Sequence, residues 1–187
     1  MARLRILVSV VEALSYAIDD QDRLIRLDEG YYRFAEENGW EGADVSLGRS
    51  LWDFVAGEDV RKVLRLLVRR IRDEVGDVEL TCRCDSPETR REMDVRIAAT
   101  SSGRGVLFSA RVRSEEERDE PQRLLDPTAP RGRERLPMCA WCDRFEVEGE
   151  WVEAEEAVAR LDLLRRSELP ELEHTVCPRD RGILLAA

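Results

Sequence analysis

The alternation of apolar and polar residues divides the chain into a mixture of helices and strands. Over residues 58–75, apolar side chains recur every three or four positions and acidic residues occupy the first turn, where the helix dipole favours them. This spacing predicts one long amphipathic helix. Over residues 78–84, 93–99 and 106–112, every second residue is apolar. That pattern predicts three antiparallel strands, each with one covered face and one face in water.

Weaker patterns precede the long helix. Apolar residues recur at helical spacing over residues 1–14, which predicts a short N-terminal amphipathic helix that covers another surface or dimerises. The runs SYAIDD and DRLIRLD flank turn-forming aspartates and predict a hairpin. The segment DEGYYRFAEENG predicts a short helix that ends at Asn38-Gly39. Trp52 and Phe54 follow in a loop and are expected in the core.

The last third of the chain has a different character. Residues 114–136 combine many charges with three prolines and lack apolar periodicity, which predicts a linker between a first domain at 15–113 and a small module at 137–187. In this module, CAWCDRF predicts a cysteine knuckle and EWVEAEEAVARLDLL predicts a helix. Trp141 and Trp151 are expected to hold the module together, because it is too short for a large core of its own.

Composition narrows the class of protein. A chain of 187 residues with 43% hydrophobic residues suits one domain and an extension, and its net charge of -10 argues against nucleic-acid binding. The N-terminal run does not fit a signal peptide, and no later stretch has the about 20 apolar residues that span a bilayer. We therefore expect a cytoplasmic protein that does not contact membranes. Its five cysteines should be thiols or metal ligands there, since disulfides are rare in that compartment.

The order of the predicted elements over about residues 12–113 resembles a PAS domain. The resemblance rests on YAIDDQDRLIRLDEGYYRFAEENG, LGRSLWDFVAGEDVRKVL and RCDSPETRREMDVRI. It implies an α+β fold, in which helices cover one face of a five-stranded antiparallel sheet, and a sensory or interaction role. Some PAS domains hold haem, flavin or a metabolite. Haem bound through a core histidine is not expected, because the sole His174 lies outside this segment, and a ligand of the PAS pocket stays unidentified.

The C-terminal part resembles a second module, which follows PAS domains in bacterial sensory proteins. That module has the form C-S-x-C-K, then an acidic helix with a tryptophan, then H-G-I-C-P-x-C. The corresponding segments here are CAWCDRF, EWVEAEEAVARL and HTVCPRD. The resemblance implies a small Cys/His helical module, but Asp180 occupies the position of the last cysteine.

Zinc is the candidate metal of this module. Cys139 and Cys142 have the spacing at which one tight turn directs two sulfurs to a single ion, and Cys177 is a third candidate. We favour His174 as the fourth ligand, because imidazole is the more frequent partner of thiolates at zinc, with Asp180 as the alternative. A third interpretation is a site that no longer binds metal, whose cysteines are small buried apolar residues.

The other two cysteines and the absence of catalytic motifs narrow the range of possible functions. Cys82 and Cys84 alternate with polar residues, which predicts packing on the covered face of the sheet rather than redox sensing. No catalytic triad, phosphate loop or H-E-x-x-H motif is present, so we expect no enzyme. The first hypothesis is a non-enzymatic sensory or protein-interaction module of bacterial signal transduction, with an unidentified protein partner and homodimerisation. The alternative is a thiol/zinc redox switch, in which oxidation of Cys139 and Cys142 ejects the metal.

Overall fold

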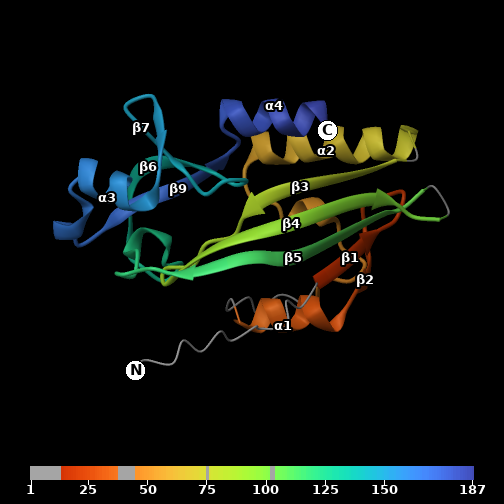
Figure 1. Cartoon of the computed structure of the whole chain (residues 1–187), viewed down its shortest axis with the longest axis horizontal. Coiled ribbons are helices and arrows are strands. Elements are labelled where there is room, and N and C mark those ends of the chain that lie inside the picture. The colour runs from red at the N-terminus through yellow and green to blue at the C-terminus, as the bar shows by residue number, and fades with distance from the viewer. Residues whose placement is uncertain (1–13, 38–44, 75, 102–103) are drawn as a thin grey trace, which may run out of the picture.

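The computed structural model describes residues 14–37, 45–74, 76–101 and 104–187. Nearly all of the predicted N-terminal helix over 1–14 lies outside these residues, as does the predicted helix end at Asn38-Gly39. Within them, the chain forms two β-sheets and four α-helices, with short 3-10 helices between them. The predicted α+β class is confirmed (Figure 1).

The larger sheet has five antiparallel strands in the order β2-β1-β5-β4-β3. The strands are β1 (Leu14–Ile18), β2 (Leu24–Leu27), β3 (Asp77–Arg83), β4 (Thr89–Ala99) and β5 (Val106–Glu117). Its register follows the predicted alternation, since Val78 faces Ile97 and Cys82 faces Met93 across β3 and β4. Apolar residues therefore gather on one face of this sheet, where they form the larger core.

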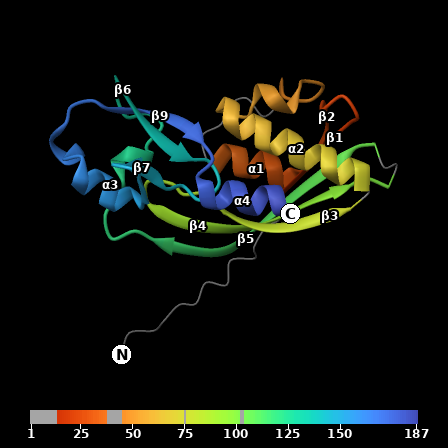
Figure 2. The same ribbon diagram turned by 90° about the horizontal axis from the view of Figure 1, so that it is seen from above.

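Helices cover that apolar face. Figure 2 shows α1 (Glu29–Glu37), α2 (Glu58–Glu74) and α4 (Pro178–Ala186) on the same side of the sheet. The predicted helix over 58–75 is α2, and its buried stripe consists of Val60, Val63, Leu67, Val68 and Ile71. Burying each such side chain contributes about 1.5–3 kcal/mol relative to leaving it in water. No helix in the described part of the chain is long and apolar enough to cross a membrane.

The C-terminal part contains a second sheet in the order β8-β7-β6-β9. Its strands are β6 (Arg131–Cys139), β7 (Phe145–Val147), β8 (Glu150–Val152) and β9 (Leu169–Thr175), and β6 and β9 run parallel. The crossover between them includes α3 (Ala154–Arg160). The helical module predicted from the sequence therefore contains a four-stranded sheet as well. Strands of three residues such as β7 and β8 are too short to show a clear alternation.

The two parts share the larger core. Helix α4 lies beside α2 (Figure 1). Val176 and Leu184 from the C-terminal part join the apolar cluster that contains Ile97 and Phe108. A separate apolar cluster, which includes Phe145, Leu163 and Leu169, forms the core of the second sheet. The C-terminal part is thus packed onto the covered face of the first sheet as well as folded around its own core.

Residues 114–136 differ from the predicted linker. Strand β5 continues to Glu117, a 3-10 helix spans Arg123–Leu125, and β6 begins at Arg131. The end of β5 pairs with β4 through charged residues, for example Arg91, whose Nε lies 2.8 Å from Glu115 Oε2. Opposite charges across strands take the place of apolar alternation here, so the hydrophobic pattern gave no strand signal.

Buried ion pairs fasten the C-terminal part to the hairpin between β3 and β4. The side chain of Arg118 is 2% exposed and lies 2.5 Å from Asp85 Oδ2, and it also pairs with Glu155 of α3. Asp85 is 1% exposed and pairs with Arg83 as well. Because breaking a buried pair leaves an uncompensated charge, these contacts hold the two parts in one arrangement.

Candidate metal centre

Four potential ligands meet where β6, β9 and α4 come together. The sulfur atoms of Cys139, Cys142 and Cys177 and a carboxylate oxygen of Asp180 all lie within 4.8 Å of one another. Asp180 Oδ2 is 3.2 Å from Cys139 Sγ and 3.1 Å from Cys177 Sγ. Cys142 Sγ is 3.9 Å from Cys177 Sγ. The structure thus brings together the three cysteines singled out in the sequence and the alternative fourth residue, Asp180.

A tight turn and a parallel strand pair create this arrangement. Cys139 ends β6, and the backbone N–H of Asp143 donates to Cys139 O at 2.9 Å, which turns the chain back and returns Cys142 to the same point. Strand β9 runs beside β6, with Thr175 opposite Cys139. Cys177 follows two residues later as the N-cap of α4, and Asp180 lies in the first turn of that helix.

The donor set fits a zinc ion. In tetrahedral coordination with zinc–sulfur bonds of about 2.3 Å, two sulfur ligands lie about 3.8 Å apart, and a sulfur and an oxygen lie slightly closer. The observed S···S separation of 3.9 Å is close to this value, and the S···O separations of 3.1–3.2 Å are a few tenths of an ångström shorter than the about 3.5 Å of that geometry. Thiolates select zinc over magnesium or calcium, and carboxylates also serve as zinc ligands. Cys139, Cys177 and Asp180 are 0%, 2% and 3% exposed, so these three ligands face away from solvent.

The site favours negative charge at Asp180 and Cys139, whereas the pKa values of Cys142 and Cys177 are raised, the first chiefly by its hydrogen bond with Cys139. Burial alone would raise the pKa of Asp180, but hydrogen bonds from the surrounding thiols outweigh it and lower that pKa. The hydrogen bond shared with Cys142 lowers the pKa of Cys139 to about 6, whereas burial raises the pKa of Cys177 to about 11. The backbone N–H of Asp180 donates to Cys177 Sγ at 3.4 Å, and the N-terminus of α4 favours anions. Metal binding would displace the remaining thiol protons.

His174, the favoured fourth ligand in the sequence, does not belong to this group. It lies in β9 opposite Met138, one residue before the Cys139–Thr175 pair, so strand alternation directs it to the other face. Its surroundings are a cleft between β9 and the N-terminus of α2, where burial lowers the pKa of His174. The geometry therefore favours Asp180 over His174 as the fourth ligand.

An apolar cavity of about 170 Å³ lies between the first sheet and α2. Its lining includes Tyr16, Leu64, Ile97, Phe108 and Trp141. The Tyr16 ring stacks on Phe108 with their centroids 4.7 Å apart, and burial raises the pKa of Tyr16 above its usual value.

The prediction that Trp141 packs within the C-terminal module is wrong, because Trp141 packs against the core of the first sheet. The only sequence signal for Trp141 is its position in CAWC between two ligand candidates, and that position does not indicate which part of the chain the side chain contacts.

Cys82 and Cys84 lie near the cluster but outside it. Both are half-buried on β3 and the turn after it, and Cys82 faces the buried Met93 on the covered side of the sheet. Burial raises the pKa of Cys82 to about 12 and that of Cys84 to about 11. These thiols stay protonated at neutral pH, which supports the predicted packing role over redox sensing.

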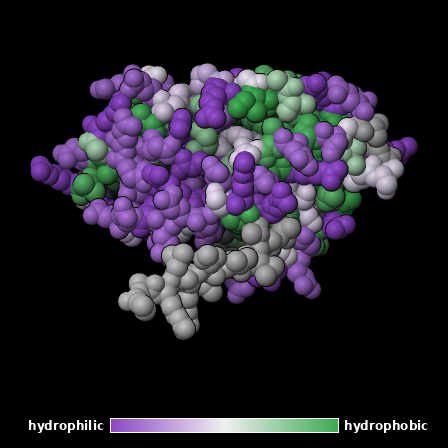
Figure 3. Space-filling view, in the orientation of Figure 1, coloured by the Kyte–Doolittle hydropathy of each residue, from purple (hydrophilic) through white to green (hydrophobic). Residues whose placement is uncertain are grey.

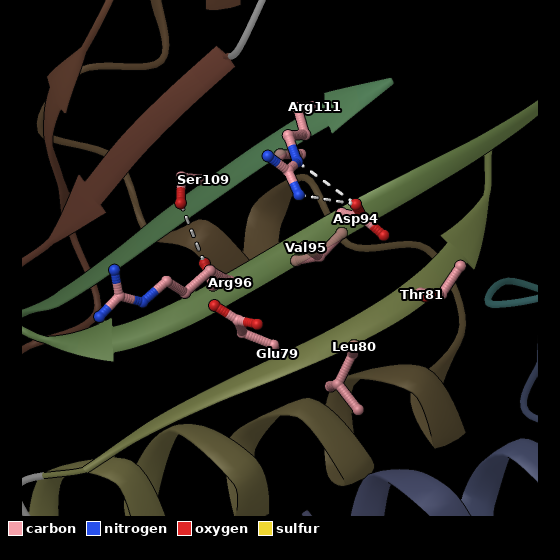
Figure 4. A pocket seen from close by; sticks show the side chains of 9 residues that line it. Glu79, Leu80, Thr81, Asp94, Val95, Arg96, Ser109 and Arg111 are labelled. Atoms are coloured by element: carbon pink, nitrogen blue, oxygen red, sulfur yellow. Dashed lines mark hydrogen bonds and ion pairs between the residues drawn. The ribbon is translucent and has the colours of Figure 1, made fainter. Parts of the chain in front are cut away.

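The face of the sheet away from the helices is polar. A shallow hollow of about 460 Å³ runs across β3, β4 and β5, and Figure 4 shows charged side chains along it while Leu80 points toward the helices. Arg111 pairs with Asp94 at 3.1 Å, and Arg96 pairs with Asp77 at 2.8 Å. Figure 3 shows a largely hydrophilic surface, with hydrophobic residues in separate patches. Exposed pairs of this kind contribute little to stability, and they neutralise one another's charge on this face.

Comparisons with known proteins do not show a family for this chain. No protein-family model matches the chain, and no curated protein matches its sequence. A solved structure with similarity to this chain is a sensory box sensor histidine kinase from Vibrio cholerae, at 8% identity and a TM-score of 0.36. The match covers 55% of this chain and 82% of that one. Similarity at this level carries no inference about function.

Proposed function

We propose that the chain is a non-enzymatic sensory or protein-interaction module of bacterial signal transduction, in which a PAS-like domain is joined to a structural zinc site. The observation that carries this proposal is the set of four ligand atoms within 4.8 Å of one another at Cys139, Cys142, Cys177 and Asp180. The PAS resemblance of the sequence and the five-stranded antiparallel sheet with helices on one face support the sensory part.

A structural role for zinc follows from the donor set. Three sulfurs and one carboxylate complete a tetrahedron, and structural zinc sites are closed in this way, whereas catalytic sites keep an open position. The ligands come from the end of β6, the turn after it and the start of α4. A bound ion would therefore cross-link the second sheet to the helix that packs on α2, and so fix the C-terminal part on the PAS-like domain.

The partners follow from charge and compartment. The net charge of -10 supports a protein partner over nucleic acid, because phosphate backbones repel an acidic surface. Thiolate ligands require a reducing environment, which supports a cytoplasmic location. We propose that the output is contact with another protein or a second copy of the chain.

The direct test is the metal content per chain, measured by elemental mass spectrometry on protein without a histidine tag. We expect about one zinc per chain, and three thiols that become reactive after chelation. Asp180→Ala should lose most of the zinc, while His174→Ala should keep it and Asp180→Cys should bind it more tightly. Protein without metal, in which Cys139, Cys142 and Cys177 react before any chelation, would refute the zinc site. Zinc retained by Asp180→Ala but lost by His174→Ala would make His174 the ligand.

A redox switch is a second candidate, favoured by the short distance between two sulfurs. The sequence suggested oxidation of Cys139 and Cys142, whereas the 3.9 Å between Cys142 Sγ and Cys177 Sγ in the structure leads us to propose the disulfide between Cys142 and Cys177 instead. Peroxide would take two electrons from the two thiols, forming one S–S bond and two molecules of water, and the loss of two thiolate ligands would release zinc. Zinc release by peroxide that a thiol reductant reverses would support the switch, and full zinc retention would refute it.

A further inference from the structure

Trp141 belongs to both the metal cluster and the apolar cavity. In the chain it lies between the ligand candidates Cys139 and Cys142. In space its side chain packs against the core of the first sheet and forms part of the cavity wall. Of the described residues that line the cavity, Trp141 is the one that comes from the C-terminal part. The two sites are therefore adjacent along the chain, since Trp141 of the cavity wall is the neighbour of Cys142.

Two hydrogen bonds hold Trp141 against the edge of the sheet. Its indole Nε1 donates to Thr81 O at 2.9 Å, and its carbonyl oxygen accepts from the backbone N–H of Arg83 at 2.8 Å. Both partners lie in β3, which has no further strand beside it at this edge of the first sheet. A shift of the cysteine turn would therefore move the tryptophan and strain these bonds to β3.

The cavity has the size and lining to take a small apolar molecule. Its volume of about 170 Å³ compares with an engineered apolar cavity of about 150 Å³ that binds benzene. Strand residues and Leu64 of α2 form the walls opposite the C-terminal part, and the stack of Tyr16 on Phe108 makes one of them rigid. The C-terminal part contributes Trp141 to the cavity wall.

We propose that metal binding at the cysteine cluster and binding of a small apolar molecule in the cavity are coupled through Trp141. This inference rests on the proposed zinc site. When Cys139 and Cys142 bind one ion, the turn between them has a single conformation and Trp141 keeps the cavity in its present shape. Without the ion, the turn is held only by hydrogen bonds and by the packing of Trp141, so the wall can shift more easily. Because coupling is reciprocal, a molecule that fits against Trp141 strengthens metal binding by the same factor.

The test measures zinc affinity of the full chain by competition with a chromophoric chelator, with and without saturating benzene. We expect benzene to tighten zinc binding by about fivefold or more. Trp141→Leu keeps the four ligands but removes the shared wall, so benzene should no longer affect zinc affinity. Ala110→Val fills part of the cavity without touching the cluster, and it should weaken benzene binding and its effect on zinc.

Each outcome separates the coupling from the zinc site itself. One zinc per chain with calorimetrically detected benzene binding, but equal zinc affinity in both conditions, overturns the coupling and leaves the zinc site standing. Absence of zinc overturns the proposed function, and absence of benzene binding overturns the cavity as a binding site. If Trp141→Leu does not fold, the cobalt-substituted wild-type chain replaces it. Benzene should shift its visible absorption, and an unchanged spectrum with bound benzene refutes the coupling.

Discussion

Substitution of Gly57 by alanine tests how closely α2 and β9 are packed. This glycine precedes α2 and has a φ of +82°, a left-handed conformation. A Cβ atom added to it would lie 2.1 Å from the carbonyl oxygen of His174, far inside ordinary contact at 3.4–4 Å. Gly57→Ala therefore combines two penalties, an unfavourable φ and a collision with the backbone of β9. Gly149 has a φ of +84° and no atom within 4 Å of such a Cβ, so Gly149→Ala isolates the first penalty.

The magnitude follows from these two terms. A side chain in the left-handed region costs about 1–2 kcal/mol, and both variants share this loss. The collision of Gly57→Ala requires β9 or α2 to move by about 1 Å, and overpacking of this kind costs about 1–3 kcal/mol. The free energy of unfolding should thus be lower for Gly57→Ala than for Gly149→Ala by about 1–3 kcal/mol.

Urea unfolding of the full chain, followed by circular dichroism, measures this difference directly. Because β9 leads to Cys177, displacement of β9 should also weaken zinc binding in Gly57→Ala, whereas Gly149→Ala should bind zinc as the wild type does. Equal free energies of unfolding for the two variants would refute the close approach of α2 and β9.

Three further predictions concern individual residues. In the native chain at pH 7, a thiol reagent should label Cys82 and Cys84 slowly, because burial raises their pKa values to about 12 and about 11; rapid labelling would contradict this. Arg118→Ala should lower the free energy of unfolding by about 3 kcal/mol, because Asp85 stays buried but keeps Arg83 as a partner. Arg160→Ala should lower it much less, since Glu150 and Glu156 lie largely in water. At Asp28, burial alone would raise the pKa, but hydrogen bonds from Ser15 of β1 and from the backbone N–H of Tyr31 in α1 lower the pKa below its ordinary value. The carboxylate therefore stabilises the fold above the unfolded pKa and loses this effect as pH falls through the folded pKa. The difference in urea stability between wild type and Asp28→Asn should be present at pH 7 and shrink below about pH 4, and a constant difference would contradict the lowered pKa.

The sequence predicted well those helices and strands that bury one face and expose the other. Helix α2 has one stripe against the sheet, so its apolar residues must repeat with the helical period, and Val60, Val63 and Leu67 do so. Strands β3, β4 and β5 have one covered face, so their apolar residues alternate. Wherever one face of an element is covered and the other is in water, the pattern of the sequence records which face is which.

The same reasoning explains where the pattern failed. The last part of β5 extends beyond the helices, so both of its faces meet water and neither selects apolar residues. Ion pairs such as Arg91 with Glu115 hold it in place of side-chain burial. Contacts that link distant segments, such as Arg118 with Asp85 or Trp141 with Thr81, leave no local period in the sequence. Their positions depend on the packing of the whole chain.

The fourth ligand shows that local spacing is insufficient without the conformation of the backbone. His174 and Asp180 are each three residues from Cys177, so the two spacings look equivalent in the sequence. Before Cys177 the chain is extended, with His174 and Thr175 at the end of β9, and an advance of about 3.3 Å per residue carries His174 about 10 Å away. The residues after it are helical, with a rise of about 1.5 Å per residue, so Asp180 lies about 5 Å further along.

The sequence does contain a signal for this difference. Pro178 directly follows Cys177, and proline favours the first position of a helix. The segment C-P-x-D therefore predicts an N-cap cysteine with its partner three residues on, where residues of one helical turn share a face. A cysteine at position 180 would start from the same backbone as Asp180. Asp180→Cys should therefore complete the zinc site without moving α4. We expect it to bind zinc more tightly than Asp180 does, because thiolates are ligands that select zinc whereas carboxylates suit magnesium and calcium.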